Sequence, residues 1–505
     1  MALVVAAFLC LSLAIIVFLF VKWRFTYWKR RGVSQLEPEF FYGDARRALT
    51  GQVSNSEELK RLYDIFKERG VRYGGIYWSF SPELVIIDTN LMKNIIQKDF
   101  SYFQGRGLYT HKNDTLSQNM FRLVGDPWKK LRVKLTPTFT SSKMKMMFGT
   151  VQEKEKRLND VMEEYAEDGG IFEVNDVTRR FTSDIIGSCA FGIESDSLQC
   201  PKSELREYGD KVNDPKLLSI WLESTLPGTI LSYTGYKCYK HVSQFYHKVV
   251  TDTINYRIQN KVIRNDFMHL LLQLRQKGFL DDESKTVQET GRITDDDIVA
   301  QCFLFFVAGY DTSASTLSYA LYELAQHQDI QNKMREEICE VLKKYDNQLT
   351  YDALKDLVYT EKVICETLRK YPVVPTITRR CNQAYKVPGT DLTIEKGTGV
   401  KISVFAVQRD PEYFPDPNKF DPERFNEEEK AKRPEYTYFP FGDGPRVCIG
   451  KRFAMMQTKA GLVGLLKNHK YSFSTTTPTN LKFKKAILLL HTSHKVPLTV
   501  QKISQ

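Results

Sequence analysis

The residue with the clearest chemical potential is Cys448, which lies in the turn-rich stretch PFGDGPRVCIG, residues 440–450. Glycines let a backbone approach a flat ligand closely, and prolines restrict the alternatives of the loop. Arg446 stands two residues before the thiol, and a positive neighbour favours thiolate over thiol. The stretch therefore predicts a thiolate that acts either as a nucleophile or as a metal ligand.

A second candidate site is AGYDTS, residues 308–313, inside a segment whose pattern predicts a helix of roughly thirty residues. Thr294 is its expected N-cap, because three aspartates follow it where carboxylates favour the helix dipole. Asp311 and Thr312 place polar groups where a core helix would carry apolar ones, and the threonine hydroxyl can bond the carbonyl of the preceding turn. The alternatives are a groove with a proton-donating hydroxyl and a core helix with one tolerated threonine.

Spacing predicts which side chains share that groove. Gln301, Phe305, Ala308 and Thr312 recur at intervals of four, three and four residues, which places them on one helical face. We therefore expect Gln301 and Phe305 to line the space beside the threonine.

Two sets of charged residues could form internal contacts. Glu366 and Arg369 in ETLRKYP are three apart on an expected helix, and Arg424 in DPERF could join them in a buried network that specifies structure. An exposed pair with this spacing would be commonplace. The other set offers one indole N–H and three guanidinium groups for carboxylates, and its members are Trp128, Arg132, Arg379 and Arg446.

Composition bounds the partners and the compartment. The 505 residues carry 72 basic and 61 acidic side chains, a formal charge of +11, but no nucleic-acid motif, so an anionic membrane or an acidic protein is favoured over nucleic acid. Nine cysteines without CxxC pairs indicate a reduced, cytosol-facing protein. His491 and His494 lie in a strand-like tail without other nearby ligands, and we expect both at the surface.

The N-terminus predicts a membrane anchor. Residues 2–21 are uncharged and long enough to cross a bilayer, and basic residues follow at once. Because a cleaved secretory peptide has its positive charge before the apolar run, a signal anchor is favoured, with the rest of the chain in the cytosol. Trp23, Tyr27 and Trp28 are expected at the membrane interface. The expected organisation is an anchor (1–21), a linker (22–45) and one catalytic domain (46–505).

Between these sites the pattern is mixed. Residues 73–88 read as a β-hairpin, helical periodicity begins near residue 128, and strand-like pieces return at 373–404 and 485–500. The apolar, Pro/Gly-interrupted residues 214–236 are interpreted as buried core or as a second patch that dips into the bilayer.

Five motifs, in this order along the chain, resemble the cytochrome P-450 family of haem-thiolate monooxygenases. They are WxxxR (128–132), AGYDTS (308–313), ExxR (366–369), PERF (422–425) and FxxGxRxCxG (441–450). The stretches FTSDIIGSCAFGIESDSL and YTYFPFGDGPRVCIG are most similar to the insect microsomal, family 6-like branch that metabolises xenobiotics. The resemblance implies a mainly α fold with smaller β-sheets and an N-terminal transmembrane helix.

The resemblance also implies a role for each matching residue. Cys448 would be the thiolate ligand of haem b iron, and Thr312 with Asp311 would deliver protons to bound dioxygen. The implied haem-binding residues are Trp128, Arg132, Arg379, Phe441, Gly442, Arg446, Cys448 and Gly450. Arg380 stands beside Arg379, so either of the two could reach a haem propionate.

The expected substrate-pocket residues are Phe103, Leu108, Met120, Phe121, Gln301, Phe305, Ala308, Thr376 and Ile377. Glu366, Arg369 and Arg424 are implied to be structural. Gln408 stands where a histidine is common in the family.

The implied partners are NADPH–cytochrome P-450 reductase, cytochrome b5, dioxygen, membrane lipid of the endoplasmic reticulum, and lipophilic substrates such as plant toxins and insecticides. The basic residues expected to dock an acidic reductase are Lys129, Lys130, Lys134, Lys451 and Arg452. Two alternatives stay open. One is a reductase-independent haem-thiolate isomerase that rearranges hydroperoxides, and the other is a non-catalytic haem sensor or carrier.

Overall fold

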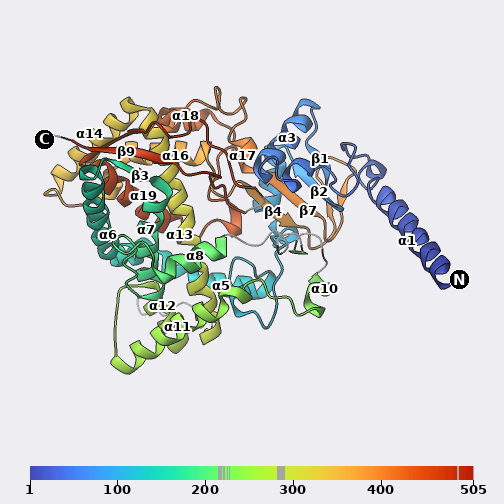
Figure 1. Ribbon diagram of the computed structural model, residues 1–505, viewed down its shortest axis with the longest axis horizontal. Helices are drawn as coiled ribbons and strands as arrows, with labels where there is room; N and C mark the ends of the chain where they lie inside the picture. The colour runs from blue at the N-terminus through green and yellow to red at the C-terminus, as the bar shows by residue number, and fades with distance from the viewer. Residues whose placement is uncertain are drawn as a thin grey trace.

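The protein has a helical body, a smaller part that contains β-sheet, and one projecting helix (Figure 1). The computed structural model describes residues 1–213, 219, 222–223, 226, 228–280, 291–485 and 488–503. The predicted mainly α fold with smaller sheets is confirmed. Much of the predicted apolar patch at 214–236 lies outside the described residues, as do residues 281–290.

Most of the longer helices lie in the helical body (Figure 1). Those in the body are α5 (Gly125–Leu135), α6 (Ser141–Glu167), α7 (Val174–Ile186), α8 (Glu204–Asn213), α11 (Lys240–Asn260), α12 (Phe267–Gln276), α13 (Asp295–Gln326), α14 (Gln328–Lys344), α16 (Val358–Lys370) and α19 (Lys451–Leu466), whereas α1 (Ala2–Arg24) and α3 (Asn55–Glu68) lie on the sheet side. The shorter helices are α2 (Arg46–Leu49), α4 (Thr89–Lys93), α10 (Gly228–Tyr233), α15 (Ala353–Asp356), α17 (Val404–Val407) and α18 (Glu427–Lys432).

Helix α13 is the long helix that the sequence predicts, and it crosses the body (Figure 1). Thr294 caps it in a reciprocal capping box with Asp297, as expected for a polar residue before an acidic first turn. Gly309 lets α7 approach closely, because a Cβ there would lie 2.8 Å from Ile186 Cδ1. The two helices also share a buried hydrogen bond of 2.8 Å between the Thr178 and Ser318 hydroxyls. α13 is therefore fixed rigidly at its centre.

The largest sheet has the order β1-β2-β7-β4. Its strands are β1 (Tyr73–Trp78), β2 (Ser81–Ile86), β7 (Gly399–Ser403) and β4 (Thr376–Arg380). β1 and β2 form the predicted hairpin, β2 pairs with β7 in parallel, and β4 pairs with β7 in antiparallel fashion. Two smaller sheets contain β3 (Ile171–Glu173), β9 (Pro497–Lys502) and β8 (His469–Phe473), and β5 (Tyr385–Lys386) with β6 (Thr393–Ile394).

Helix α1 projects from the sheet side of the molecule, and its apolar side chains are exposed (Figure 1). Its length and apolar composition would allow it to cross a membrane. α13 passes the same test but is buried inside the protein, so α1 is the better candidate for a membrane helix.

The segment after α1 packs against the domain, and this corrects the expected place of two aromatic residues. Trp28 is fully buried and donates from Nε1 to the Ile76 carbonyl at 3.1 Å, and Tyr27 is also buried. A Cβ at Gly75 would lie 2.3 Å from the Trp28 ring, so this glycine makes room for the indole. Trp28 and Tyr27 thus belong to the protein core, and Trp23 is the exposed aromatic residue that remains for a membrane interface.

Candidate functional site

The Cys448 loop has one defined backbone path. The Cys448 amide donates to the Phe441 carbonyl at 2.9 Å, which closes the loop across its base. Gly442 and Gly444 adopt φ of 69° and 65°, the left-handed region that favours glycine. A Cβ at Gly444 would lie 2.3 Å from the Ile96 carbonyl oxygen, so the loop also needs glycine for packing. The positive φ values and the close packing explain why glycine occupies positions 442 and 444 of this loop.

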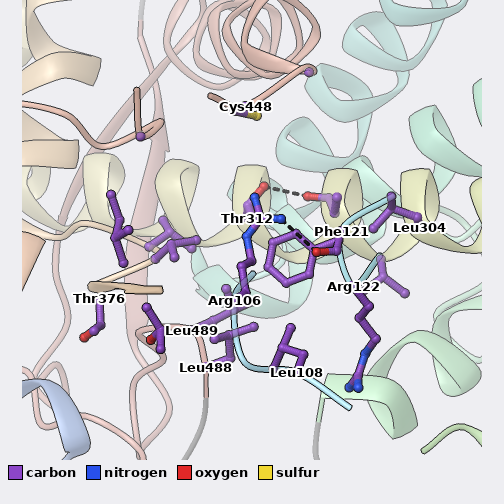
Figure 2. Close-up of a pocket in the computed structure, with 18 of the residues that line it drawn as sticks. Arg106, Leu108, Phe121, Arg122, Leu304, Thr312, Thr376, Cys448, Leu488 and Leu489 are labelled. Carbon is purple, nitrogen blue, oxygen red and sulfur yellow. Dashed lines mark hydrogen bonds between the residues drawn. The ribbon is translucent and has the colours of Figure 1, made fainter. Parts of the chain in front are cut away.

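The loop and α13 face each other across one large cavity of about 1640 Å³. Cys448 lies on one side and Thr312 on the other, and apolar side chains form much of the remaining wall (Figure 2). All eight residues expected to bind the cofactor line this cavity: Trp128, Arg132, Arg379, Phe441, Gly442, Arg446, Cys448 and Gly450. Tertiary structure therefore brings together residues that span more than three hundred positions.

Arg106 lines the cavity together with the predicted Arg132, Arg379 and Arg446, although the sequence did not predict it. Burial, together with the charges of Arg379, Arg446 and Arg132, lowers the pKa of Arg106 well below its usual range. Arg106 donates to the Phe121 carbonyl at 2.7 Å (Figure 2). It stands between two glycines in QGRG, residues 104–107, and this isolated arginine in a flexible turn was the available signal.

The arginines fit a group that carries carboxylates. Burial lowers the pKa of Arg379 to about 10, and burial with repulsion from Arg379 and Arg132 lowers the pKa of Arg446 to about 9. The Nε atoms of Arg379 and Arg446 are buried without a hydrogen-bond partner among the described residues. Anionic groups would satisfy these donors and relieve the repulsion. The residues present thus fit a flat cofactor with two propionates, with Cys448 on one face.

Side-chain contacts hold the arginines toward the cavity. Arg446 donates to the carbonyls of Met120 and Leu123 at 3.1 and 2.5 Å, and its guanidinium lies 4.1 Å from the Trp128 ring centroid. Arg379 lies on β4, where its side chain is buried, whereas the neighbouring Arg380 is exposed and bonds the Gly397 carbonyl. Arg379 is therefore the better placed of the two for a propionate, although both line the cavity.

The protein environment of the Cys448 thiol pulls its pKa in two directions. Burial raises the pKa above its usual value, while the Gly450 amide and the charges of Arg132, Arg106 and Lys451 oppose the rise. The main guanidinium groups that favour the thiolate are thus Arg132 and Arg106, in place of Arg446 as the sequence had indicated. Sγ is accessible from the cavity although the residue lies deep in the protein. A metal ion would complete the deprotonation, since metal binding displaces the thiol proton.

Thr312 lines the cavity from the middle of α13. Its hydroxyl donates to the Ala308 carbonyl at 2.7 Å (Figure 2), the i−4 bond that the sequence indicated. Although the hydroxyl hydrogen is donated in this bond, the oxygen has lone pairs that can still accept a hydrogen bond or a proton from the cavity side.

Asp311 does not line the cavity, although it is adjacent to Thr312 in sequence. Its buried carboxylate contacts Arg179 Nη2 at 3.1 Å and His491 Nε2 at 2.6 Å. Burial raises its pKa, but Arg179 and His491 outweigh that effect and hold the pKa below its usual value. His491 is itself buried, so its predicted surface position is wrong. Sequence spacing could not show this, because Asp311 and His491 are 180 positions apart.

Most of the expected substrate-pocket residues line the cavity: Leu108, Met120, Phe121, Phe305, Ala308, Thr376 and Ile377. Two do not, and these predictions are wrong. Phe103 is buried against the Tyr385 ring at a centroid distance of 5.0 Å in the core beside the sheet. Gln301 is buried and accepts from the Met120 amide at 3.0 Å, so it holds the loop that lines the cavity. Leu304, Leu488 and Leu489 contribute further apolar wall (Figure 2).

Glu366, Arg369 and Arg424 form a network behind the Cys448 loop. Arg369 Nε contacts Glu366 Oε2 at 2.7 Å, both side chains are fully buried, and Arg424 Nε lies 3.6 Å from Glu366. Arg369 also donates to the Gln408 carbonyl at 3.0 Å. The side-chain amide of Gln408 in turn donates from Nε2 to the Leu368 carbonyl and accepts at Oε1 from the Phe439 backbone amide. Gln408 thus connects α16 to the approach of the Cys448 loop.

Comparisons with known proteins agree with this geometry. The family model for cytochrome P450 matches residues 48–498. Cytochrome P450 6k1 of Blattella germanica is 41% identical, covering 97% of this chain and 96% of that protein. Cytochrome P450 6a2 of Drosophila melanogaster is also 41% identical, covering 95% of this chain and 96% of that protein. With a cavity that joins the thiol, the arginines and the Thr312 hydroxyl, the chain belongs to the cytochrome P450 family of haem monooxygenases.

Proposed function

We propose that this monooxygenase inserts one atom of dioxygen into lipophilic foreign compounds, such as plant toxins and insecticides, with electrons from NADPH delivered by cytochrome P450 reductase. The observation that carries the proposal is the apolar-walled cavity in which Cys448 and Thr312 face each other. Apolar walls with few polar groups suit lipophilic ligands. The similarity to insect cytochromes P450 6k1 and 6a2 supports an insect-type detoxification role.

Each part of the site has a role in this proposal. When bound, haem b supplies the iron at which dioxygen is activated. The Cys448 thiolate would hold it from one face, while Arg106, Arg132, Arg379 and Arg446 would bind the propionates. The Thr312 hydroxyl would give a proton into the cavity and take another from cavity water. Positioning and proton supply are thus the contributions of the chain.

The proposed reductase surface is basic. Lys129, Lys130, Lys451 and Arg452 are exposed, and Lys134 is partly engaged with the Arg292 carbonyl at 3.2 Å. Arg132 joins α5 to the Cys448 loop by bonding the Val447 carbonyl at 2.8 Å, so this surface lies directly behind the thiol. An acidic flavoprotein, or cytochrome b5 as a second donor, would be steered there by charge.

The proposed location is the membrane of the endoplasmic reticulum, with α1 as a single anchor and the catalytic domain in the cytosol. The support is the exposed apolar α1 followed by basic residues. Deletion of residues 2–21 should shift the protein from the membrane fraction toward the soluble fraction at high salt. If the truncated chain stays fully membrane-bound, α1 is not the main attachment.

Two measurements test the proposed activity. The reduced protein treated with carbon monoxide should show the spectrum of thiolate-ligated haem, and that of an imidazole-ligated haem would overturn the assignment of Cys448. NADPH consumption and oxygenated product should both require purified reductase when lipophilic toxins are supplied. Hydroperoxide rearrangement without reductase would favour the isomerase alternative, and haem binding without any turnover would favour a sensor.

A further inference from the structure

We propose that His491 carries protons between a surface groove and the cavity that contains Thr312, with Asp311 as the residue that orients it. The inference rests on the proposed proton-donating role of Thr312 and extends it to a named supply route. It concerns a buried histidine that none of the sequence motifs includes.

The contacts of His491 are those of a held imidazole. The residue is 6% exposed, and its Nε2 lies 2.6 Å from Oδ2 of the fully buried Asp311. The second carboxylate oxygen, Oδ1, contacts Arg179 Nη2 at 3.1 Å and Nε at 3.2 Å. Arg179 thus holds the carboxylate, which lies in ion-pair contact with the ring nitrogen without the geometry of a hydrogen bond.

His491 also stands between two spaces. One is the large cavity, whose wall includes Thr312, Ser313 and His491. The other is a smaller groove of about 360 Å³. Its lining residues include Glu173, Arg179, Tyr319, Lys484, His491 and His494. His491, Arg179 and Lys484 line both spaces, so His491 forms part of the wall of each.

The charged groups around His491 include one carboxylate that stays ionised. The Asp311 carboxylate stays ionised at neutral pH, because Arg179 and His491 together outweigh its desolvation and keep its pKa below the usual value. An ionised carboxylate stabilises an imidazolium, while the nearby cations oppose it. The ionisable groups that face His491 from the packed elements are Asp311 and Tyr319 of α13, Arg179 of α7, Glu173 of β3, and Lys484, His494 and Lys495 of its own segment.

The Ser313 hydroxyl is a second polar group at this place. It is buried, lines the cavity beside Thr312, and has no hydrogen-bond partner among the described residues. A hydroxyl of this kind is satisfied by water when the space is polar and large enough. We therefore expect a cavity water to bind the Ser313 hydroxyl, between Thr312 and the groove that His491 lines.

The proposed step is a proton transfer without redox change. An N–H bond of the imidazolium breaks and an O–H bond forms on a cavity water, which in turn reprotonates the Thr312 hydroxyl. The neutral imidazole then takes one proton from water in the groove, which restores the starting state. One proton thus moves from solvent to the threonine in each cycle.

The competing role is a structural brace that holds the C-terminal segment on α13. Tyr319 of α13 already performs that task, since its hydroxyl donates to the Leu490 carbonyl at 2.8 Å. Two backbone bonds hold the segment elsewhere, from Lys484 N to His491 O at 2.7 Å and from Leu490 N to Val373 O at 2.9 Å. His491→Gln should therefore keep the fold, because glutamine can still donate to Asp311 but cannot carry a proton at neutral pH.

The test compares His491→Gln with His494→Gln in the full-length haem protein. The matched control removes a second imidazole of the same segment that neither touches Asp311 nor lines the cavity. His491→Gln should keep the haem content and melting temperature of the wild type. Product formed per NADPH should fall about tenfold or more. This fall should be smaller than the ~10²–10⁴-fold loss that is typical when a direct general acid is removed. His494→Gln should stay at the wild-type value.

A readout independent of turnover is the reactivity of the imidazole toward diethyl pyrocarbonate in the folded haem protein. If solvent reaches His491 through the groove, peptide mass spectrometry should find the modification at His491 as well as at His494. The proposal is overturned if His491 stays unmodified where His494 is fully modified, or if His491→Gln and His494→Gln have equal product yields.

Thr312→Ala separates this inference from the proposed function on which it rests. That variant should lose product and release peroxide while His491 stays as reactive toward diethyl pyrocarbonate as in the wild type. If Thr312→Ala keeps the wild-type product yield, the proton-donating role of the threonine fails, whereas the access of solvent to His491 is still decided by its own reactivity.

Discussion

Arg132 donates from Nη2 to the carbonyl oxygen of Val447 at 2.8 Å, one residue before the Cys448 thiol. Arg132 also lowers the pKa of that thiol and lines the cofactor cavity. One side chain therefore supports the loop, the thiolate and the proposed propionate site together.

We expect Arg132→Ala to lower the haem content of the purified protein severely, with a loss of about 1.5–3 kcal/mol for the hydrogen bond alone. Arg132→Lys should be intermediate, because lysine keeps the charge without the planar fork. Haem per polypeptide, measured by absorbance against protein mass, checks both. Arg452→Ala is the control, since this exposed arginine bonds the Phe139 carbonyl at 3.4 Å and is not among the described residues that line the cavity. Equal haem content in all three variants would contradict this role.

Gly444→Ala should distort the Cys448 loop, because the new Cβ would meet the Ile96 carbonyl oxygen at 2.3 Å. Gly125→Ala is a matched control with a similar positive φ but no atom within 4 Å of the Cβ position. Both variants should cost about 1–3 kcal/mol of backbone strain, and only Gly444→Ala should also lose haem. Melting temperature and haem content distinguish strain from steric conflict. If Gly125→Ala also loses haem, backbone strain alone explains the loss in Gly444→Ala, and the contact with Ile96 is not needed.

Thr312→Ala should lower product per NADPH by ~10²-fold or more while haem content stays normal, because it removes the hydroxyl that faces the cavity. Peroxide should account for the NADPH that no longer yields product. Thr312→Ser keeps a hydroxyl and should restore most of the yield. Product and peroxide are measured in the same reconstituted reaction. If serine rescues no better than alanine, the methyl group is what matters and proton delivery is the wrong explanation.

Glu366→Ala should destabilise the protein by about 3–5 kcal/mol, because it leaves the fully buried Arg369 without its carboxylate. Lys60→Ala is the control, since it breaks a partly exposed i,i+4 pair with Asp64 that is worth only about 0.3–0.5 kcal/mol. Denaturant unfolding monitored by haem absorbance gives both values. A cost for Glu366→Ala as small as that for Lys60→Ala would mean that solvent reaches the network.

Asp44 should make stability depend on pH in the mildly acid range. Burial raises its pKa from 3.8 to about 6, although the Tyr77 amide and Arg61 oppose the rise. The folded state therefore holds a proton that the unfolded state has released between these values, so stability falls as pH rises through them. The loss is of the order of 3 kcal/mol.

Asp44→Asn should remove this dependence, because a neutral amide can still accept the Tyr77 N–H at no charging cost. Melting temperatures of the two proteins should thus converge near pH 4 and diverge by pH 7, with the variant the more stable. The opposite order at pH 7 would show that Arg61 dominates over burial.

Local sequence determined much of this protein. The cap of α13, the apolar run of α1 and the hairpin β1–β2 depend on neighbouring residues, so spacing and residue type were enough to predict them. The motif residues around Cys448 and Thr312 could be chosen for the same reason, since each motif is a short local pattern with few ways to satisfy its chemistry.

Tertiary structure decided which neighbour covers each face. Gln301 shares a helical face with Phe305 but is covered by the Met120 loop, and Trp28 is buried on the sheet because Gly75 leaves room for it. His491 reaches Asp311 only through the fold of the C-terminal segment. Helical or strand periodicity fixes the direction of a side chain relative to its own element, whereas burial and charge pairing depend on a second element far away in sequence.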